Sequence, residues 1–279
     1  MTTQQTAPPT TMAAARRRAG GVGALYSGEF PAVIGRGLRA TKSSNWVVVL
    51  SGFFEPIFYL LSLGLGLGSY IGAVQDGSHS IPYAAYIAPG LLAVSAMNGA
   101  IYDSTWNVFF KMHFGKLYEG MLATSLGPLD VALGEILLAL LRGGLYAVGF
   151  LLVMQVLGLN LAWTAVLALP AVLLIAFGFA SLGMAITSYL KTFQQMDWIN
   201  FALLPMFLLS ATFYPLSVYP VPIQWFIQAL PLWQAVDMLR QLTTGYIEPS
   251  MVIHLLYYAV LIAFGLMFTT RRLRALFLD

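Results

Sequence analysis

The sequence contains no cysteine and has few charged residues. Of its 279 residues, 9% are charged and 59% are hydrophobic. The lack of cysteine excludes a disulfide framework, a thiolate metal site and a cysteine nucleophile. A soluble domain carries roughly 25% charged residues, so this chain has too few to cover a surface that faces water. The composition therefore indicates an integral membrane protein.

Sequence motifs of enzymes are also missing. The chain has no phosphate-binding G-x-x-x-x-G-K-[ST] segment and no HExxH or GxSxG segment. Its three histidines, His79, His113 and His254, do not have the spacing of metal ligands. We therefore expect no catalytic residues, no metal site and no cofactor on this chain. If ATP powers the protein, another polypeptide must bind and hydrolyse it.

Long apolar runs predict an all-α fold. About 20 apolar residues cross a bilayer as a helix. We predict six candidate spans, which together form a single transmembrane domain over residues 46–279. They cover residues 46–69, 83–110, 131–157, 164–190, 199–213 and 251–269. The fifth is short enough to be a partial or tilted crossing.

The distribution of positive charge predicts the orientation, because lysine and arginine gather on the cytoplasmic side of membrane proteins. Twelve of the 14 such residues fall on one side of the six-span arrangement. They are Arg16, Arg17, Arg18, Arg36, Arg39, Lys42, Lys111, Lys116, Lys191, Arg271, Arg272 and Arg274. Both termini are therefore expected to be cytoplasmic.

The region before the first span has two parts. Residues 1–21 are small and polar without the apolar core of a signal peptide, and we predict a disordered cytoplasmic tail. Over residues 22–45, Phe30, Val33, Ile34 and Leu38 recur at helical spacing. This pattern predicts an amphipathic helix in the membrane interface. The alternative is a basic linker next to the membrane.

Four ionisable residues lie in or near the predicted spans: Glu55, Asp103, Glu135 and Arg142. Charged groups are unfavourable in lipid and are functional candidates by default. They would line a pathway or bond between helices. For Glu135 an alternative is a position among the headgroups, where it only orients the span.

The segment between the fifth and sixth spans is too apolar for a hydrated loop, and its five prolines over residues 214–250 prevent a single span. We predict re-entrant helices that dip into the outer leaflet, where protein covers their backbone. An aromatic belt at the interface is the alternative. Asp237 and Arg240, three residues apart, are predicted to pair. The predicted outer gate consists of Tyr214, Trp225, Trp233, Asp237 and Arg240.

Two stretches resemble a known family. Residues 116–144, KLYEGMLATSLGPLDVALGEILLALLRGG, resemble the cytoplasmic loop and third span of ABC-2 type transport permeases. Within that family they look most like the permeases of nodulation lipo-oligosaccharide exporters and related drug exporters. Residues 208–245, LLSATFYPLSVYPVPIQWFIQALPLWQAVDMLRQLTTG, resemble the family's segment between spans five and six. The resemblance covers nearly the whole chain after residue 24.

The resemblance implies that the loop after the second span is a coupling helix that docks on a separate ATPase. Tyr118, Met121, Leu122 and Ser125 recur at helical spacing and would form its docking face, with Glu119 beside them. A connector that lies on the membrane is the alternative.

The resemblance further implies the membrane subunit of an ABC exporter in the bacterial inner membrane, with ATP and Mg²⁺ on the partner ATPase. A second permease chain, identical or homologous, would complete the pathway. The substrate would be amphipathic or hydrophobic: a glycolipid, lipo-oligosaccharide or drug. An alternative from another class is a proton-coupled secondary transporter that uses Glu55, Asp103 and Glu135 as a relay. A membrane-embedded transferase would need a clustered polar site, which the sequence does not show.

Overall fold

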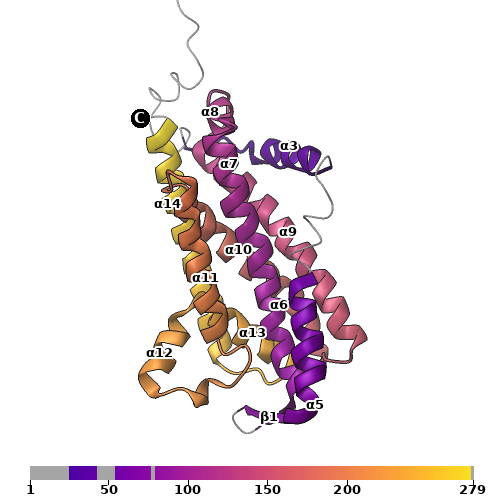
Figure 1. The fold of residues 1–279 in the computed structure, drawn as a ribbon. Helices are drawn as coiled ribbons and strands as arrows, with labels where there is room; N and C mark the ends of the chain where they lie inside the picture. Colours follow the sequence, from indigo (N-terminus) through magenta and orange to yellow (C-terminus); the bar gives the residue numbers. More distant parts are fainter. Residues whose placement is uncertain (1–24, 43–53, 77–78, 278–279) are drawn as a thin grey trace, which may run out of the picture.

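The computed structural model describes residues 25–42, 54–76 and 79–277, and these residues form a bundle of long helices (Figure 1). Five helices are long and apolar enough to cross a membrane, by length and composition. They are Phe54–Ile71, Tyr83–His113, α9 (Pro128–Val156), Trp163–Thr187 and α14 (Ser250–Phe277). The predicted tail, residues 1–21, and the start of the predicted first span lie outside the described residues.

Shorter helices complete the bundle. The helix Tyr83–His113 consists of α6 (Tyr83–Tyr102), a π-helical segment (Asp103–Asn107) and α7 (Val108–His113). The long helix Trp163–Thr187 contains α10 (Ala168–Thr187), and Phe54–Ile71 ends with α5 (Gly68–Ile71). The separate shorter helices are α3 (Phe30–Lys42), α8 (Leu117–Leu122), α11 (Asp197–Leu209), α12 (Val221–Ala229) and α13 (Pro231–Thr244).

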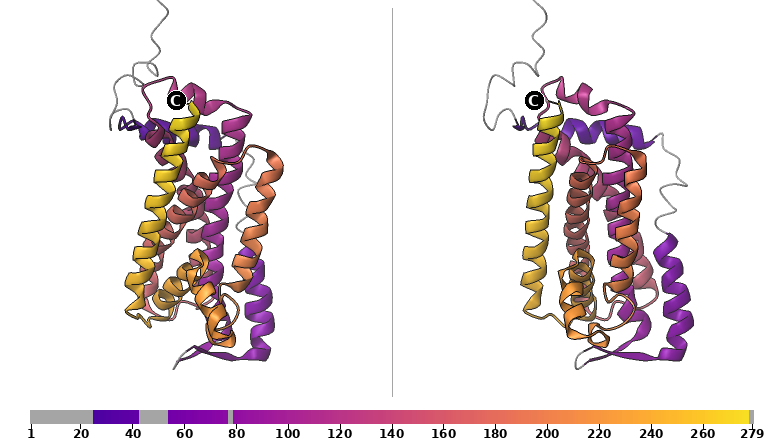
Figure 2. Two further views of the ribbon diagram at one scale, coloured as in Figure 1. Left: turned by 90° about the vertical axis from the view of Figure 1, so that its left-hand side faces the viewer. Right: turned by 60° about the vertical axis from the view of Figure 1, so that its left-hand side comes forward.

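The predicted fifth span is α11, and it is shorter than expected. It has 13 residues, or about 20 Å of helix, against a hydrocarbon core of about 30 Å. Pro205 lies inside it, and Ala211, just beyond its end, has a left-handed backbone with φ 52°. Figure 2 shows α11 alongside the long helices. The helix α11 is therefore shorter than the hydrocarbon core is thick.

The helix Tyr83–His113 occupies the centre of the bundle. In its most apolar window 89% of the residues are buried, against 17% in Phe54–Ile71 and in α14. It packs against α9, α10 and α13. Gly99 makes the close crossing with α9 possible, because a Cβ there would lie 2.9 Å from the Cα of Gly143. Small residues at a crossing allow two backbones to approach closely.

One strand pair departs from the predicted all-α fold. Strands β1 (Ala73–Asp76) and β2 (His79–Pro82) pair antiparallel between the first two long helices, with Val74 opposite Ile81. Ile81 is buried, so one face of the hairpin covers the bundle. Runs of four residues are too short for periodicity to reveal, and the sequence therefore did not predict them.

The two ends of the bundle differ in composition. At one end lie α3, α7, α8 and the C-terminal part of α14, and α3 crosses that end at a steep angle to the long helices (Figures 1 and 2). These elements and their junctions carry Arg36, Arg39, Lys111, Lys116, Arg271, Arg272 and Arg274. At the other end lie the hairpin, α12 and α13. Most basic residues of the described chain thus lie at the end that contains α8, whereas Arg142 lies within the bundle and Arg240 in α13.

Candidate functional site

The N-termini of α3 and α9 meet on a single buried carboxylate, that of Asp130. It accepts hydrogen bonds from the backbone N–H groups of Ser27, Gly28 and Glu29, at 2.7, 3.0 and 3.1 Å. The Ser27 hydroxyl donates at 2.8 Å, and the backbone N–H of Gly127 at 2.8 Å. The first N–H groups of a helix have no partner within it and carry partial positive charge. Asp130 therefore caps the entry to α3 and the start of α9 together.

Close backbone packing surrounds this carboxylate. A Cβ on Gly127 would lie 2.3 Å from the carbonyl oxygen of Leu25, so only glycine fits there. Further along the same contact, a Cβ on Gly134 would lie 2.5 Å from the Cβ of Val33. The two helices are thus in contact over about two turns of α9.

A second carboxylate, Glu135, lies five positions further along α9. It is almost fully buried and accepts hydrogen bonds from Arg36 of α3, at 3.0 Å, and from Lys111 of α7, at 2.5 Å. The structure thus places Glu135 between three helices. We call Ser27, Gly28, Glu29, Arg36, Lys111, Gly127, Asp130 and Glu135 the α3–α9 joint.

The predicted docking face of α8 requires a correction. Tyr118, Met121 and Leu122 are buried inside this chain, with exposures of 0%, 7% and 2%. Helical spacing reveals a face that avoids water, but it cannot tell whether a partner or the chain itself covers that face. Burial raises the pKa of the Tyr118 hydroxyl well above its usual value, and the nearby Glu135 carboxylate raises it further, so the phenol is neutral.

The other side of α8 and the turn after it are open. Glu119, Gly120, Ala123 and Thr124 are exposed. Ser125 is half-buried, and its hydroxyl donates to the carboxylate of Glu29, next to the α3–α9 joint. The exposed side of α8 and of the turn after it therefore consists of polar and small residues, with the α3–α9 joint directly beside it.

Asp103 and Arg142 form an ion pair deeper in the bundle. Their charged atoms are 2.9 Å apart, and each side chain is 13% exposed. Asp103 begins the π-helical segment, and the Asn107 amide also donates to it. Arg142 lies over the ring of Tyr102 at 5.6 Å. The pair joins the central helix to α9.

The structure does not assemble a chain of carboxylates. Glu55 is exposed near the start of the described part of its helix. Asp103 and Glu135 are each paired with their own cations, Arg142 for the first and Arg36 with Lys111 for the second. The three acids are not bonded to one another in the described chain, so the geometry offers no direct proton relay among them.

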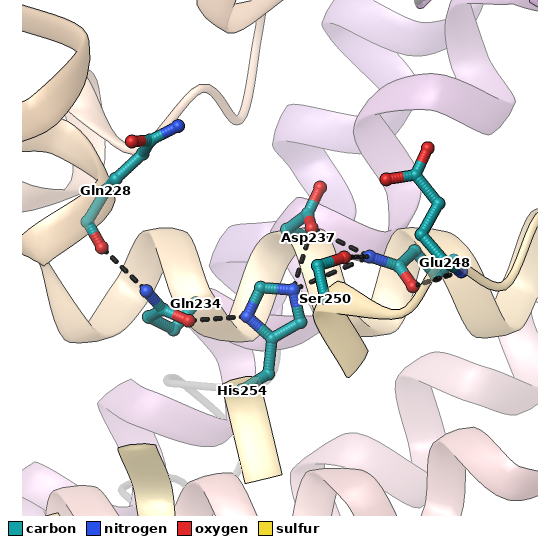
Figure 3. Close-up of polar contacts among 7 residues, drawn as sticks. Gln228, Gln234, Asp237, Glu248, Ser250 and His254 are labelled. Atoms are coloured by element: carbon teal, nitrogen blue, oxygen red, sulfur yellow. Dashed lines mark hydrogen bonds and ion pairs between the residues drawn. The ribbon is translucent and has the colours of Figure 1, made fainter. Parts of the chain in front are cut away.

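The predicted pairing of Asp237 with Arg240 is wrong. Arg240 is buried and lies 3.9 Å over the ring of Tyr86 in α6. It donates to the carbonyl oxygens of Ala211, at 2.8 Å, and Tyr86, at 3.4 Å. Asp237 instead bonds to His254 of α14 (Figure 3). A spacing of three allows pairing, but here each side chain faces a different helix and finds a better partner there.

The remaining residues of the predicted gate do not converge. Tyr214 and Trp225 are exposed, by 40% and 70%, and the Tyr214 hydroxyl accepts a hydrogen bond from Tyr219. Trp233 is partly buried and contacts the His254 ring edge to face, with centroids 5.8 Å apart. Trp233 and Asp237 thus face α14, while Arg240 faces α6.

Two residues at the centre of polar contacts were not identified from the sequence. Asp130 follows Gly127 and Pro128, a pattern typical of a helix start with an acid in its first turn. His254 is an ionisable residue inside a membrane helix, which is a functional signal by default. Neither pattern predicts the residues that bond to Asp130 and His254, because those residues belong to other helices or segments of the chain.

Comparison with known proteins identifies the family. Residues 29–243 match the ABC-2 type transporter family. The chain is 31% identical to Nodulation protein J of Rhizobium leguminosarum bv. viciae over 258 residues, 91% of this chain and 98% of that protein. It is 32% identical to Nodulation protein J of Bradyrhizobium diazoefficiens over 249 residues, 88% of this chain and 93% of the relative.

The family match covers most of the chain, including the α3–α9 joint from Glu29 onward, the central helix and α13. The relatives span nearly its whole length. The chain therefore belongs to the ABC-2 type transporter family, as the membrane permease subunit of an ABC exporter whose ATP hydrolysis takes place on a separate chain.

Proposed function

We propose that this permease exports an amphipathic saccharide–lipid substrate, such as a lipo-oligosaccharide, across the bacterial inner membrane. Two permease chains, identical or homologous, pair around the pathway, and an ABC ATPase that binds ATP and Mg²⁺ docks on each at the end formed by α3 and α8. The observation that supports the proposal is the α3–α9 joint, whose hydrogen bonds connect the end that contains α3 and α8 to the long helix α9. The name of the relatives, Nodulation protein J, supports the substrate class.

Transport itself supplies the test of this function. Inside-out vesicles that contain the permease with its ATPase should accumulate a labelled lipo-oligosaccharide only when ATP is present. Collapse of the proton gradient at constant ATP should leave the rate unchanged. Transport that persists without ATP and stops with the gradient would support the proton-coupled alternative instead.

We propose six spans, with α11 and the turn before it as the fifth crossing, and both termini in the cytoplasm. The basic residues at the α8 end support this orientation. Re-entrant α12 and α13 would form an outer gate at the opposite end, within which Arg240 anchors α13 to α6.

Tag accessibility should report this topology. A tag inserted at Asp76, at the end of β1, is expected to be reached by antibody in spheroplasts without permeabilisation. A tag after the C-terminal residue should be reached only after permeabilisation. Protection of the Asp76 tag in intact spheroplasts would contradict the proposed orientation.

We propose that the open side of α8, rather than its apolar face, contacts the ATPase. Ala123 is exposed there, so Ala123→Trp should block docking sterically while the permease still folds. We expect ATPase stimulation by the permease to fall at least about tenfold, a loss of roughly 1.4 kcal/mol in docking. ATPase assays on the reconstituted complex measure this.

Two controls separate docking from folding. Ala73→Trp introduces the same bulk at an exposed site of β1, at the opposite end, and should leave stimulation unchanged. Met121→Asp places a charge in a buried position and should lower the amount of permease in the membrane. Full stimulation by Ala123→Trp would exclude this surface as the docking site.

A further inference from the structure

The last helix, α14, runs along the edge of the bundle from the end that contains α12 and α13 to the end that contains α8 (Figures 1 and 2). It has 28 residues and no proline, so it forms a stiff rod about 42 Å long. In its most apolar window only 17% of the residues are buried, against 89% in the central helix. Its buried residues fall into three groups, which are His254 with Tyr258, Gly265, and Thr269 with Thr270 and Leu273. We call residues 250–264 the α13 arm and residues 266–277 the α8 arm.

The α13 arm is bonded to α13 by buried polar side chains (Figure 3). The ring nitrogens of His254 lie 2.8 Å from a carboxylate oxygen of Asp237 and 2.5 Å from the side-chain oxygen of Gln234. The Tyr258 hydroxyl donates to the carbonyl oxygen of Pro231, the first residue of α13, at 2.8 Å. Both α14 side chains are buried. Because a buried polar group is costly to leave without its partner, we expect α13 to move together with this arm.

The α8 arm packs against α8. Leu273 is 1% exposed and belongs to the same buried apolar cluster as Tyr118 and Met121 of α8. At the edge of this contact, Arg272 donates to the carbonyl oxygen of Ser188, just beyond α10, at 3.3 Å. That hydrogen bond is longer than those of the α13 arm and is only partly buried. A displacement of α8 therefore acts directly on this arm of α14.

Between the two arms, the backbone of α14 approaches α10 closely at Gly265. A Cβ on Gly265 would lie 2.6 Å from both the carbonyl carbon and the Cβ of Ser181, so no side chain separates the two helices there. Small residues allow this kind of backbone approach between membrane helices. A stiff rod that meets its neighbour at such a point tilts about it, and its two ends then move in opposite directions.

We propose that α14 is a lever: displacement of α8 by the ATPase tilts α14 about Gly265 and thereby moves α13 at the opposite end of the bundle. This inference rests on the proposed docking of the ATPase at the α8 end. It deepens that proposal, because it names the helix that carries the movement from one end of the bundle to the other. The lever lies outside the part of the chain that matches the family, which ends at residue 243.

The helix α13 passes the movement on to α11. Arg240 of α13 donates to the carbonyl oxygen of Ala211, just beyond the end of α11, at 2.8 Å. The same guanidinium group lies 3.9 Å over the ring of Tyr86 in the deeply buried central helix. We therefore expect α13 to rotate about Arg240 while its α14 side moves. Shifts of packed helices in such transitions are typically about 1–2 Å.

Distances between spin labels in the intact exporter, with its ATPase bound, test the lever. The natural chain has no cysteine, so pairs of cysteines can be placed at exposed positions of α14 and of the helix Trp163–Thr187. Val252 with Val166 reports on the α13 arm. Ala275 with Ile186 reports on the α8 arm. An excess of unlabelled permease keeps each measured distance within one chain.

The two distances should change with opposite sign. When the ATPase is trapped with nucleotide, we expect each mean distance to shift by about 1–2 Å or more. One should lengthen while the other shortens, because the two pairs lie on opposite sides of Gly265. Shifts of the same sign would show that α14 moves as a whole, and constant distances would show that it does not move. Either result would overturn the lever.

Two leucine variants of the α8 arm complete the experiment. Leu273→Ala removes the buried contact and should abolish the shift at the Val252 pair while the ATPase still co-purifies with the permease. Leu276→Ala, at a position that is 42% exposed, is the matched control and should retain the full shift. An unchanged shift in Leu273→Ala would contradict the lever. Opposite shifts without export of a lipo-oligosaccharide would contradict only the proposed function.

Discussion

The substitution Asp130→Asn is expected to reduce ATP-driven export by at least about tenfold. The carboxylate accepts five hydrogen bonds, from Ser27, Gly28, Glu29 and Gly127. An asparagine nitrogen in place of one carboxylate oxygen would present a donor to other donors. Bonds to a charged group contribute about 1.5–3 kcal/mol each, so we expect the α3–α9 joint to lose roughly 3 kcal/mol or more.

The matched control is Glu248→Ala. Glu248 has the same charge, but its side chain is exposed at the opposite end of the bundle, and the hydrogen bond to Gln241 comes from its backbone N–H. It should change export by less than about twofold, as surface substitutions usually do. Transport assays in vesicles, normalised to permease content, measure both variants. Equal effects of the two changes would show that the α3–α9 joint does not connect ATP hydrolysis on the partner to transport through the spans.

Removal of one partner of the Asp103–Arg142 pair is expected to have the second large effect. Both side chains are 13% exposed inside the bundle. Breaking a buried pair costs about 3–5 kcal/mol, because the remaining charge has no partner. Arg142→Gln and Asp103→Asn should therefore each lower the amount of folded permease strongly.

The double variant distinguishes charge pairing from a role in the pathway. Asp103→Asn with Arg142→Gln leaves no unpaired charge and should recover most of the folded protein. Denaturation of the detergent-solubilised permease gives the stability, and vesicle assays give the transport. A double variant as unstable as the single ones would contradict the pairing argument. Recovered folding without recovered export would assign the pair to the substrate pathway.

The long helices could be predicted because each is coded within one stretch of sequence. Apolar runs placed the second, third and fourth spans within a few residues of the helices observed, and the start of the sixth as well, although α14 continues to Phe277 beyond the predicted end at residue 269. The family also followed from local stretches, residues 116–144 and 208–245. The fifth span, predicted over residues 199–213, is α11 (Asp197–Leu209), which ends earlier because the backbone turns left-handed at Ala211.

Partners, by contrast, were decided by the tertiary structure. The spacing of Tyr118, Met121 and Leu122 indicated an apolar face, yet the fold covers that face with the chain's own core. The spacing of Asp237 and Arg240 allowed a pair, yet α14 and α6 supply each with a different partner. Sequence alone therefore determined that this chain is a helical ABC-2 permease, since hydrophobic length and local motifs are properties of contiguous residues. Only the tertiary structure decided which charges meet, because Asp130 and Ser27 lie 103 positions apart and His254 and Asp237 lie 17 apart, and their contact depends on how the helices pack.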